Sequence, residues 1–352
     1  MDHLTSGQAQ RAIYIDFECL KTRPHPTPKL LGILGDAGTF EQLILDPALA
    51  PARVAKKYCR VIDPPVAVAD LVERCEREDR LLVGWSFFDR DVAMRANPAV
   101  AERVRARYRN AIQAARPWRQ WIHPSSKIER DDPHAPRHTL DKYAVLAGYP
   151  AARRLANAEP AKWIRRILGQ LAAAKGRYRA TPSKVIGQWH DLLTYNEHDC
   201  RALRHIALRA SRELDAWRAY ERTKYCFDDG RTTICFRIGS RSGRLEAMLS
   251  RRNARRWAFL TAWNPGSVPL TAEENRRRQA QLVQDLRDYE VLPGEGIGDD
   301  PSWEPERSLM VLGISRGKAV TLAQKYGQLA IVVGTRQIAP KLVPCAPTPA
   351  LP

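Results

Sequence analysis

Residues 12–20, AIYIDFECL, combine the apolar pattern of a β-strand with two acidic side chains placed two positions apart. Side chains alternate between the two faces of a strand, so the two isoleucines share one face, and Tyr14, Asp16 and Glu18 share the other. Two carboxylates on one face repel each other, and burying them is costly unless a cation compensates. An acid-x-acid pair also arises by chance, so its meaning depends on what the rest of the chain supplies.

A third acid lies on the apolar face of a long helical pattern, VIGQWHDLLTYNEHDCRALRHIALRASRELDAW. Positions spaced by three and four residues share one face of a helix. The stripe at this spacing consists of Leu192, Tyr195, Asp199, Ala202 and Ile206. A carboxylate on a core-facing stripe is costly unless a cation or strong donors neutralise it. Asp199 is therefore a candidate functional acid.

A fourth acid, Asp89, ends the apolar run RLLVGWSFFD, for which we predict a buried strand. The end of a strand is the usual place for a functional side chain in an α/β sheet. Asp91 is an alternative two positions on. Four acids from separate elements, with no Lys or Arg inside their motifs, predict a divalent metal site. Ligands that are all oxygen favour Mg²⁺ or Mn²⁺ over zinc.

The order of patterns predicts two domains. Strand patterns at 12–20, 30–35 and 41–46, a helix at 66–78, a further strand and then helices fit an α/β mixed sheet flanked by helices. From about residue 216, a hairpin with an Asp-Asp-Gly turn, further strands and helices indicate a smaller α+β domain. We predict domains at 1–215 and 216–345 and a disordered tail at 346–352, in a Pro-rich ending that begins near 339.

The net charge of +18 is concentrated between residues 103 and 184, which contain 19 Lys and Arg against 5 Asp and Glu. Aromatic residues are interleaved with these cations, as in grooves that bind phosphates and stack bases. The alternative is a set of solvated arginine-rich helices with aromatic residues in the core. The charge favours a nucleic acid, DNA or RNA, as the partner. The candidate contacts are Trp85, Arg103, Arg107, Arg153, Arg154, Arg165 and Arg166.

Seven scattered cysteines, an odd number without close pairs, predict reduced thiols in a cytoplasmic protein and argue against a disulfide framework or a zinc knuckle. The longest apolar runs are strand-sized and too short to span a membrane. We see no secretory signal in the first residues. These features predict a cytoplasmic protein without a membrane partner, and they leave its oligomeric state open.

The ordered set of acids resembles the DEDD exonucleases of the ribonuclease-H-like superfamily across residues 11–212. The motifs are D-x-E on a first strand, F-D after a second, and YNEHD on a late helix, with HTLDKYAVLAGY upstream. The set is similar to a bacterial branch of predicted ribonuclease-H-like exonucleases. The resemblance implies that Asp16, Glu18, Asp89 and Asp199 hold two Mg²⁺ or Mn²⁺ ions.

The same resemblance implies two-metal hydrolysis of phosphodiester bonds from the 3′ end, with a single-stranded 3′ end of DNA or RNA as the partner. Tyr195 stands where the tyrosine subgroup orients the attacking water, a role that Glu18 could share. Thr194 stands where the other subgroup has histidine. The chain departs from the usual pattern at Cys19, where Thr or Ser is common, and at Gly84, Trp85 and Ser86, where many members carry His-Asn.

The second domain resembles an uncharacterised bacterial family marked by FLTAWNP, EEN, GEG, W-x-P-E and GQLAIVV, all present in that order. One expectation is a pocket lined by the residues Glu274, Asn275, Glu295, Glu304, Trp263 and Trp303. The favoured alternative is that both tryptophans are core rings and that the Gly-x-Gly at 294–296 is a loop.

The leading hypothesis is a metal-dependent 3′–5′ exonuclease, a phosphodiester hydrolase, with an accessory second domain. A nucleic-acid-binding adaptor on the same fold, with weak or no catalysis, is the runner-up. A third hypothesis assigns the main activity to the second domain, acting on a small ligand.

Overall fold

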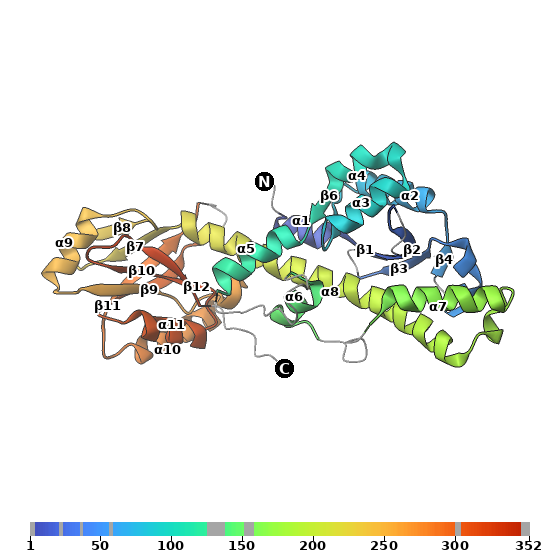
Figure 1. Ribbon diagram of the computed structural model, residues 1–352. Helices are drawn as coiled ribbons and strands as arrows, with labels where there is room; N and C mark the ends of the chain where they lie inside the picture. The colour runs from blue at the N-terminus through green and yellow to red at the C-terminus, as the bar shows by residue number, and fades with distance from the viewer. Residues whose placement is uncertain are drawn as a thin grey trace. The chain divides into compact units, whose positions relative to one another are not determined.

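The computed structural model describes residues 4–20, 24–35, 38–55, 59–124, 138–150, 158–299 and 304–345. The chain divides into two compact units, coloured along the chain in Figure 1. Unit 1 contains the described residues up to 116 and those from 138 to 211. Unit 2 contains residues 117–124 and the described residues from 212 onward. The sequence predicts a boundary at 215/216, whereas the units meet between Ser211 and Arg212.

Unit 1 is built on a six-stranded mixed sheet in the order β4-β3-β2-β1-β5-β6. Its strands are β1 (Ile13–Leu20), β2 (Thr27–Leu34), β3 (Phe40–Ile44), β4 (Cys59–Val61), β5 (Leu82–Gly84) and β6 (Tyr108–Asn110). The first three strands form an antiparallel meander, and β5 and β6 run parallel to β1. The central strand β1 pairs on both sides, which places its side chains at the middle of the sheet.

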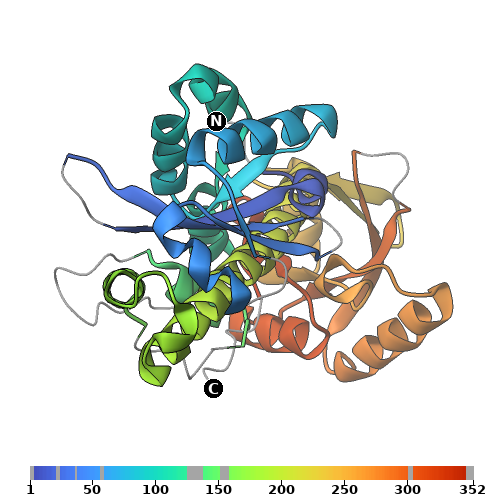
Figure 2. The ribbon, with the colours of Figure 1, turned by 90° about the vertical axis from the view of Figure 1, so that its right-hand side faces the viewer.

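Helices cover both faces of this sheet, as Figure 2 shows with blue and teal helices above it and lime helices below. The helices are α1 (Ser6–Arg11), α2 (Pro64–Arg77), α3 (Phe87–Ala96), α4 (Ala101–Arg107), α5 (Ile112–Ile122), α6 (Leu140–Leu146), α7 (Pro160–Ala173) and α8 (Ser183–Arg222). Ile13 and Ile15 pack under α2, α3 and α4, whereas Tyr14 packs with α8. Burial of these apolar faces holds the three layers together.

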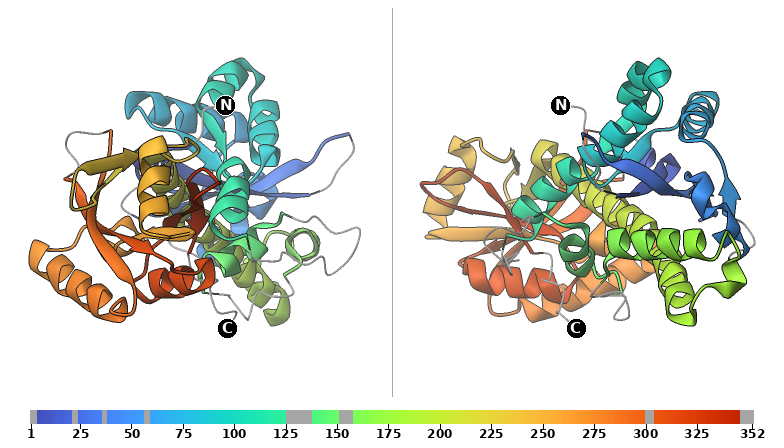
Figure 3. Two further views of the ribbon diagram at one scale, coloured as in Figure 1. Left: turned by 90° about the vertical axis from the view of Figure 1, so that its left-hand side faces the viewer. Right: turned by 45° about the vertical axis from the view of Figure 1, so that its right-hand side comes forward.

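Unit 2 is an antiparallel seven-stranded half-barrel in the order β13-β12-β9-β11-β10-β7-β8. Its strands are β7 (Lys224–Asp228), β8 (Thr233–Phe236), β9 (Arg256–Leu260), β10 (Glu290–Ile297), β11 (Glu306–Leu312), β12 (Ala330–Thr335) and β13 (Lys341–Pro344). The helix α9 (Gly243–Arg251) packs on one face, and α10 (Ala272–Asp285) and α11 (Arg316–Lys325) pack on the other (Figure 3).

This architecture confirms the predicted fold class, a mixed sheet flanked by helices followed by a smaller α+β domain. The three early strands and the hairpin of unit 2 are where the sequence predicts them. None of the helices in the described ranges combines the length and apolar character that crossing a bilayer requires.

Two local predictions are wrong. The strand predicted to end at Asp89 ends at Gly84, because Ser86 caps a helix by accepting a hydrogen bond from the Phe88 amide at 3.2 Å. The Gly-x-Gly at 294–296 lies in β10 rather than in a loop, since both of its neighbouring strands satisfy its backbone. Residues 341–344 of the Pro-rich ending form β13, paired with β12, and residues 346–352 lie outside the described ranges.

The prediction of reduced thiols is wrong for two of the seven cysteines. Cys226 and Cys235 face each other across the β7–β8 hairpin and form a disulfide. The hairpin register places the two thiols side by side although they are nine positions apart in the sequence. The other five, Cys19, Cys59, Cys75, Cys200 and Cys345, are free thiols.

Candidate active site

The strand β1 directs Asp16 and Glu18 toward α8, as the alternation of side chains requires. Asp16 is half-buried and Glu18 is buried. The side-chain amide of Asn196, on α8, donates to Asp16 Oδ2 at 2.8 Å and to its carbonyl oxygen at 3.0 Å. The β1–β2 ladder also shifts register after Glu18, and such bulges re-aim side chains. The first two predicted acids therefore face α8, the helix that carries Asp199.

Asp89 reaches β1 from the first turn of α3. Because β5 ends at Gly84, the Phe17 amide of β1 donates instead to Asp89 Oδ1, at 3.2 Å. Gly84 leaves room for this carboxylate, since a β-carbon there would lie 3.0 Å from Asp89 Oδ2. Asp89 is buried, whereas Asp91 is 43% exposed and pairs with Arg90 at 2.8 Å. Only the first of these two acids faces the strand.

Asp199 lies on the buried stripe of α8 together with Leu192, Ala202 and Ile206. Its buried Oδ1 has no hydrogen-bond partner in the described part of the chain, and His198 Nδ1 lies 3.6 Å from it. Buried carboxylate oxygens are normally satisfied, because an unmet acceptor costs about 1–3 kcal/mol. An orphaned acceptor beside three further acids is the feature expected of a cation-binding site.

The electrostatics of the four acids show that they act on one another. Burial, together with the charges of Asp199 and Asp89, raises the pKa of Glu18 to about 8. The pKa of Asp89 is raised to about 7, mainly by burial, although the backbone amides of Phe17, Asp89 and Ser86 lower it. These carboxylates therefore hold protons at neutral pH unless a positive charge replaces them.

The pKa values of the remaining two acids are raised as well. For Asp16 the largest cause is burial, followed by repulsion from Glu18, Asp199 and Asp89, whereas the Asn196 amide lowers it. For Asp199 burial also dominates, and His198 opposes it. Since the charges of Glu18, Asp89 and Asp199 all act on Asp16, the four acids form one electrostatic cluster although they come from separate elements.

Tyr195 is half-buried and lies one turn before Asp199. Burial raises the pKa of its phenol far above the ordinary value of 10, and the charges of Asp199 and Glu18 raise it further. The phenol is therefore protonated at any physiological pH. It can donate a hydrogen bond but cannot serve as a base.

A buried amide network that sequence reasoning missed holds Asp16 in place. Asn196 is fully buried, and Gln42 Nε2, from β3, donates to its Oδ1 at 3.1 Å and to the Leu193 carbonyl at 2.8 Å. Gly32 on β2 makes room, because a β-carbon there would lie 2.5 Å from Asn196 Oδ1. The signal in the sequence was the polar Asn196 beside a Tyr-x-x-x-Asp pattern. That signal did not indicate which residues Asn196 would contact by hydrogen bonds.

We expect Asn196→Leu, which keeps the branching at Cγ but removes the polar atoms, to reduce the thermal stability of the protein and to misplace Asp16. The substitution removes the only amide that donates to the Asp16 carboxylate among the described residues. The loss of a buried hydrogen bond costs about 1–3 kcal/mol. Thermal unfolding measures that loss. An unchanged midpoint would contradict the role of the network, and Asn196→Gln offers a conservative comparison.

Asp141, on α6, is a fifth acid near this cluster, and its charge raises the pKa values of both Asp199 and Tyr195. It lies in the HTLDKYAVLAGY motif but is exposed at the surface. Sequence reasoning used that motif only for the resemblance. The structure places Asp141 at the rim of the acidic cluster.

The donor chemistry of the cluster fits hard divalent cations. In the described ranges, neither Lys nor Arg forms an ion pair with any of the four acids. No three His, Cys, Asp or Glu side chains of the described residues lie close enough to form a finished metal-binding group as they stand. The four carboxylates would have to move closer to one another to coordinate an ion. The residues fit the ion by donor type, charge and shared location.

The predicted nucleic-acid contacts fall into four groups. Arg103 pairs with Glu76 and Arg107 pairs with Asp79, so both cations are already engaged. Trp85 packs against Tyr143, with ring centroids 5.3 Å apart. Their role in binding stays a prediction.

The remaining contacts are two exposed arginines and two arginines that lie outside the described residues. Arg165 and Arg166 are exposed on α7, the helix that packs on the same face of the sheet as α8. Arg153 and Arg154 lie outside the described residues. Of the described members of the predicted set, the two arginines of α7 are therefore exposed cations on a helix that shares a face of the sheet with α8.

In unit 2 the expected pocket does not gather the predicted side chains. Glu274 pairs with Arg277 at 2.8 Å, and Asn275 is buried, donating to Asn264 Oδ1 at 2.9 Å. Glu295 alone of the predicted set lines the groove that the structure shows. Trp303 lies outside the described residues.

Comparison with known families assigns part of unit 2. Residues 260–331 match a family described as a protein of unknown function, DUF3293. This match confirms the predicted resemblance of the second domain to an uncharacterised family. No curated protein and no solved structure matches the chain. The mixed sheet of unit 1 is thus of unassigned family.

Proposed function

We propose that unit 1 is a metal-dependent 3′–5′ exonuclease of the DEDD type, hydrolysing phosphodiester bonds of DNA or RNA. The observation that supports this most is the convergence of Asp16, Glu18, Asp89 and Asp199 from three elements into one buried acidic cluster. A protein does not bury four mutually repelling carboxylates without a function that uses them. The mixed sheet has the architecture that the resemblance to these nucleases implies.

In this proposal the four carboxylates hold two Mg²⁺ or Mn²⁺ ions. Bound ions of this kind supply positive charge to a phosphate and lower the pKa of bound water. Asn196 fixes one oxygen of Asp16 and thereby orients the other. Tyr195, protonated throughout, donates a hydrogen bond that positions the attacking water. Glu18 is the second group placed to orient that water.

The proposed activity is tested by incubating the purified full chain with 3′-labelled and 5′-labelled single-stranded DNA and RNA. We expect Mn²⁺ or Mg²⁺ to permit stepwise release of nucleotides from the 3′ end, and EDTA to stop it. A 5′ label would then give a ladder, whereas a 3′ label would appear at once as mononucleotide. Absence of metal-dependent cleavage on both polymers would contradict the proposal.

A nucleic-acid-binding adaptor is the second candidate, favoured by the exposed Arg165 and Arg166 on α7. It predicts salt-sensitive binding of single strands without their degradation. The cleavage assay separates the two readings when the same samples are also analysed by gel shift. Binding without a ladder in Mn²⁺ would favour the adaptor.

A further inference from the structure

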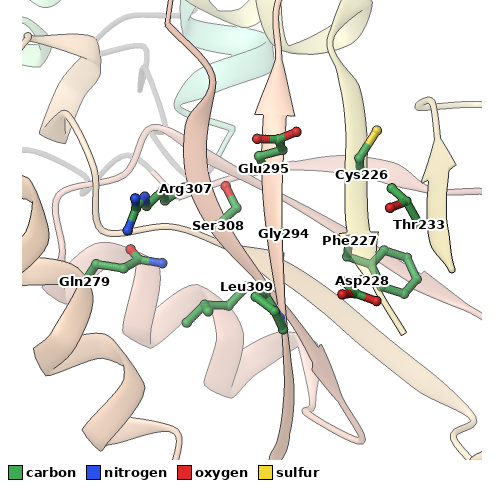
Figure 4. A pocket seen from close by; sticks show the side chains of 11 residues that line it. Cys226, Phe227, Asp228, Thr233, Gln279, Gly294, Glu295, Arg307, Ser308 and Leu309 are labelled. Atoms are coloured by element: carbon green, nitrogen blue, oxygen red, sulfur yellow. The ribbon is translucent and has the colours of Figure 1, made fainter. Parts of the chain in front are cut away.

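Unit 2 carries a groove of about 410 Å³ on the face of its sheet that also carries α10. Its floor comes from β7, β10 and β11, and Gln279 of α10 forms one side (Figure 4). This volume lies within the range of about 300–1,000 Å³ that small-molecule sites occupy. Most of the residues that line it fall within the segment 260–331, whose family has no known function.

Three charged side chains project into this groove without forming an ion pair among the described residues. They are Asp228, Glu295 and Arg307, all exposed. Other acids of the same unit are paired, as Asp229 is with Arg251 at 2.7 Å and Asp285 with Lys325 at 2.6 Å. In a chain with a net charge of +18, acids left unpaired beside a cavity are available to a ligand.

The groove also holds a buried donor that lacks an acceptor. Gln279 Oε1 accepts from the Ala262 amide at 2.9 Å, which fixes the orientation of the side-chain amide. Gln279 Nε2 is then buried without a hydrogen-bond partner in the described part of the chain. Figure 4 shows the guanidinium of Arg307 extending toward Gln279. The two side chains form a donor end suited to a carboxylate.

An acid, Asp228 on β7, lies at the opposite end of the groove. Glu295 on β10 is the direct cross-strand partner of Arg307 on β11, so it lies between the two ends. Two strand spacings of about 4.8 Å separate β11 from β7. Pro293 and Leu309 form an apolar floor between the ends. The groove thus offers acceptors and donors roughly 10 Å apart.

We propose that this groove binds a short extended peptide, with its amino terminus at Asp228, its carboxylate at Arg307 and Gln279, and Glu295 beside the peptide between the two ends. Three extended residues span at most about 10 Å, which matches the separation of the two ends. Two acids against one cation disfavour nucleotides, because phosphate would meet net negative charge. A free amino acid is too short to reach both ends.

The proposal is tested by isothermal titration of the full chain with trialanine, N-acetyl-trialanine, trialanine amide, alanine and adenosine 5′-monophosphate. We expect trialanine to bind best, and each capped peptide and alanine to bind at least about tenfold more weakly. Tighter binding of the nucleotide, or no saturable binding of trialanine at about 10 mM, would overturn the proposal.

Variants assign each end. Arg307→Gln should remove the preference for trialanine over its amide, and Asp228→Asn should reduce the preference over the acetylated form. Arg276→Gln, an exposed and unpaired arginine of α10, is the matched control and should change neither. Preferences that are unchanged in both groove variants would refute the assignment. Nuclease activity has no part in these readouts, so the result is independent of the function proposed for unit 1.

Discussion

Replacing Asp199 or Asp89 by asparagine is expected to reduce metal-dependent nucleotide release by at least about a thousandfold. A factor of this size corresponds to about 4 kcal/mol in the activation free energy. The amide keeps the shape of the carboxylate but removes its charge, so the site loses a ligand for hard cations while the fold persists. Single-turnover cleavage of a 5′-labelled strand in Mn²⁺ measures the loss.

Asp91→Asn is the matched control for Asp89→Asn. Asp91 lies two residues away on the same helix but faces outward and pairs with Arg90. We expect this variant to cleave at nearly the wild-type rate. Full activity in Asp199→Asn, or equal losses in the Asp89 and Asp91 variants, would contradict the assignment of these acids.

Replacing Glu18 by glutamine is expected to stabilise the metal-free protein at pH 8 while abolishing its activity. The pKa of Glu18 is about 8 in the folded protein, against an ordinary value of 4.5 when unfolded. Because folding raises this pKa, the unfolded chain loses the Glu18 proton at a lower pH than the folded protein does. The free energy of unfolding therefore falls as the pH rises from about 4.5 toward 8. Glutamine removes that cost, which amounts to at least about 1 kcal/mol. Thermal unfolding in EDTA at pH 8 detects it.

The same experiment at pH 5 supplies one control, because Glu18 is then protonated in the folded state and the stabilisation should shrink. Glu41→Gln supplies a second control. This acid of β3 pairs with Arg74 at 3.1 Å, so removing its charge relieves no repulsion and should not stabilise the protein. Addition of Mn²⁺ should raise the unfolding midpoint of the wild type more than that of Glu18→Gln. A lower midpoint for Glu18→Gln at pH 8 would contradict the description of the cluster.

The acidic cluster was predictable where periodicity alone determines direction. Alternation along β1 places Asp16 and Glu18 with Tyr14, and the three-four spacing on α8 places Asp199 with Leu192. Both rules depend only on local geometry, which the sequence states directly. The structure accordingly brings these side chains to one side of the sheet.

The rest depended on contacts between segments far apart in the chain. Gln42 and Asn196 are separated by more than 150 positions, and no local pattern marks them as partners. Gly32 is small because α8 passes close to β2, which only the packed structure reveals. Ser86 did carry a local signal, because serine is a common N-cap residue and Ser86 directly precedes Phe87, the first residue of α3. This signal predicts that the strand ends before Ser86.

The cysteine prediction failed although the necessary information was present. The Asp-Asp-Gly turn predicts the hairpin, and counting outward from the turn sets Cys226 opposite Cys235. The prediction considered spacing along the chain and not register across the hairpin. For paired strands, register is the relevant distance.

The most direct test of the central claim is anomalous diffraction from crystals of the full chain grown with Mn²⁺. The account predicts a manganese peak on β1, ligated by oxygen atoms of Asp16 together with those of Glu18, Asp89 or Asp199. A peak bound elsewhere, with these four carboxylates unengaged at saturating Mn²⁺, would contradict it.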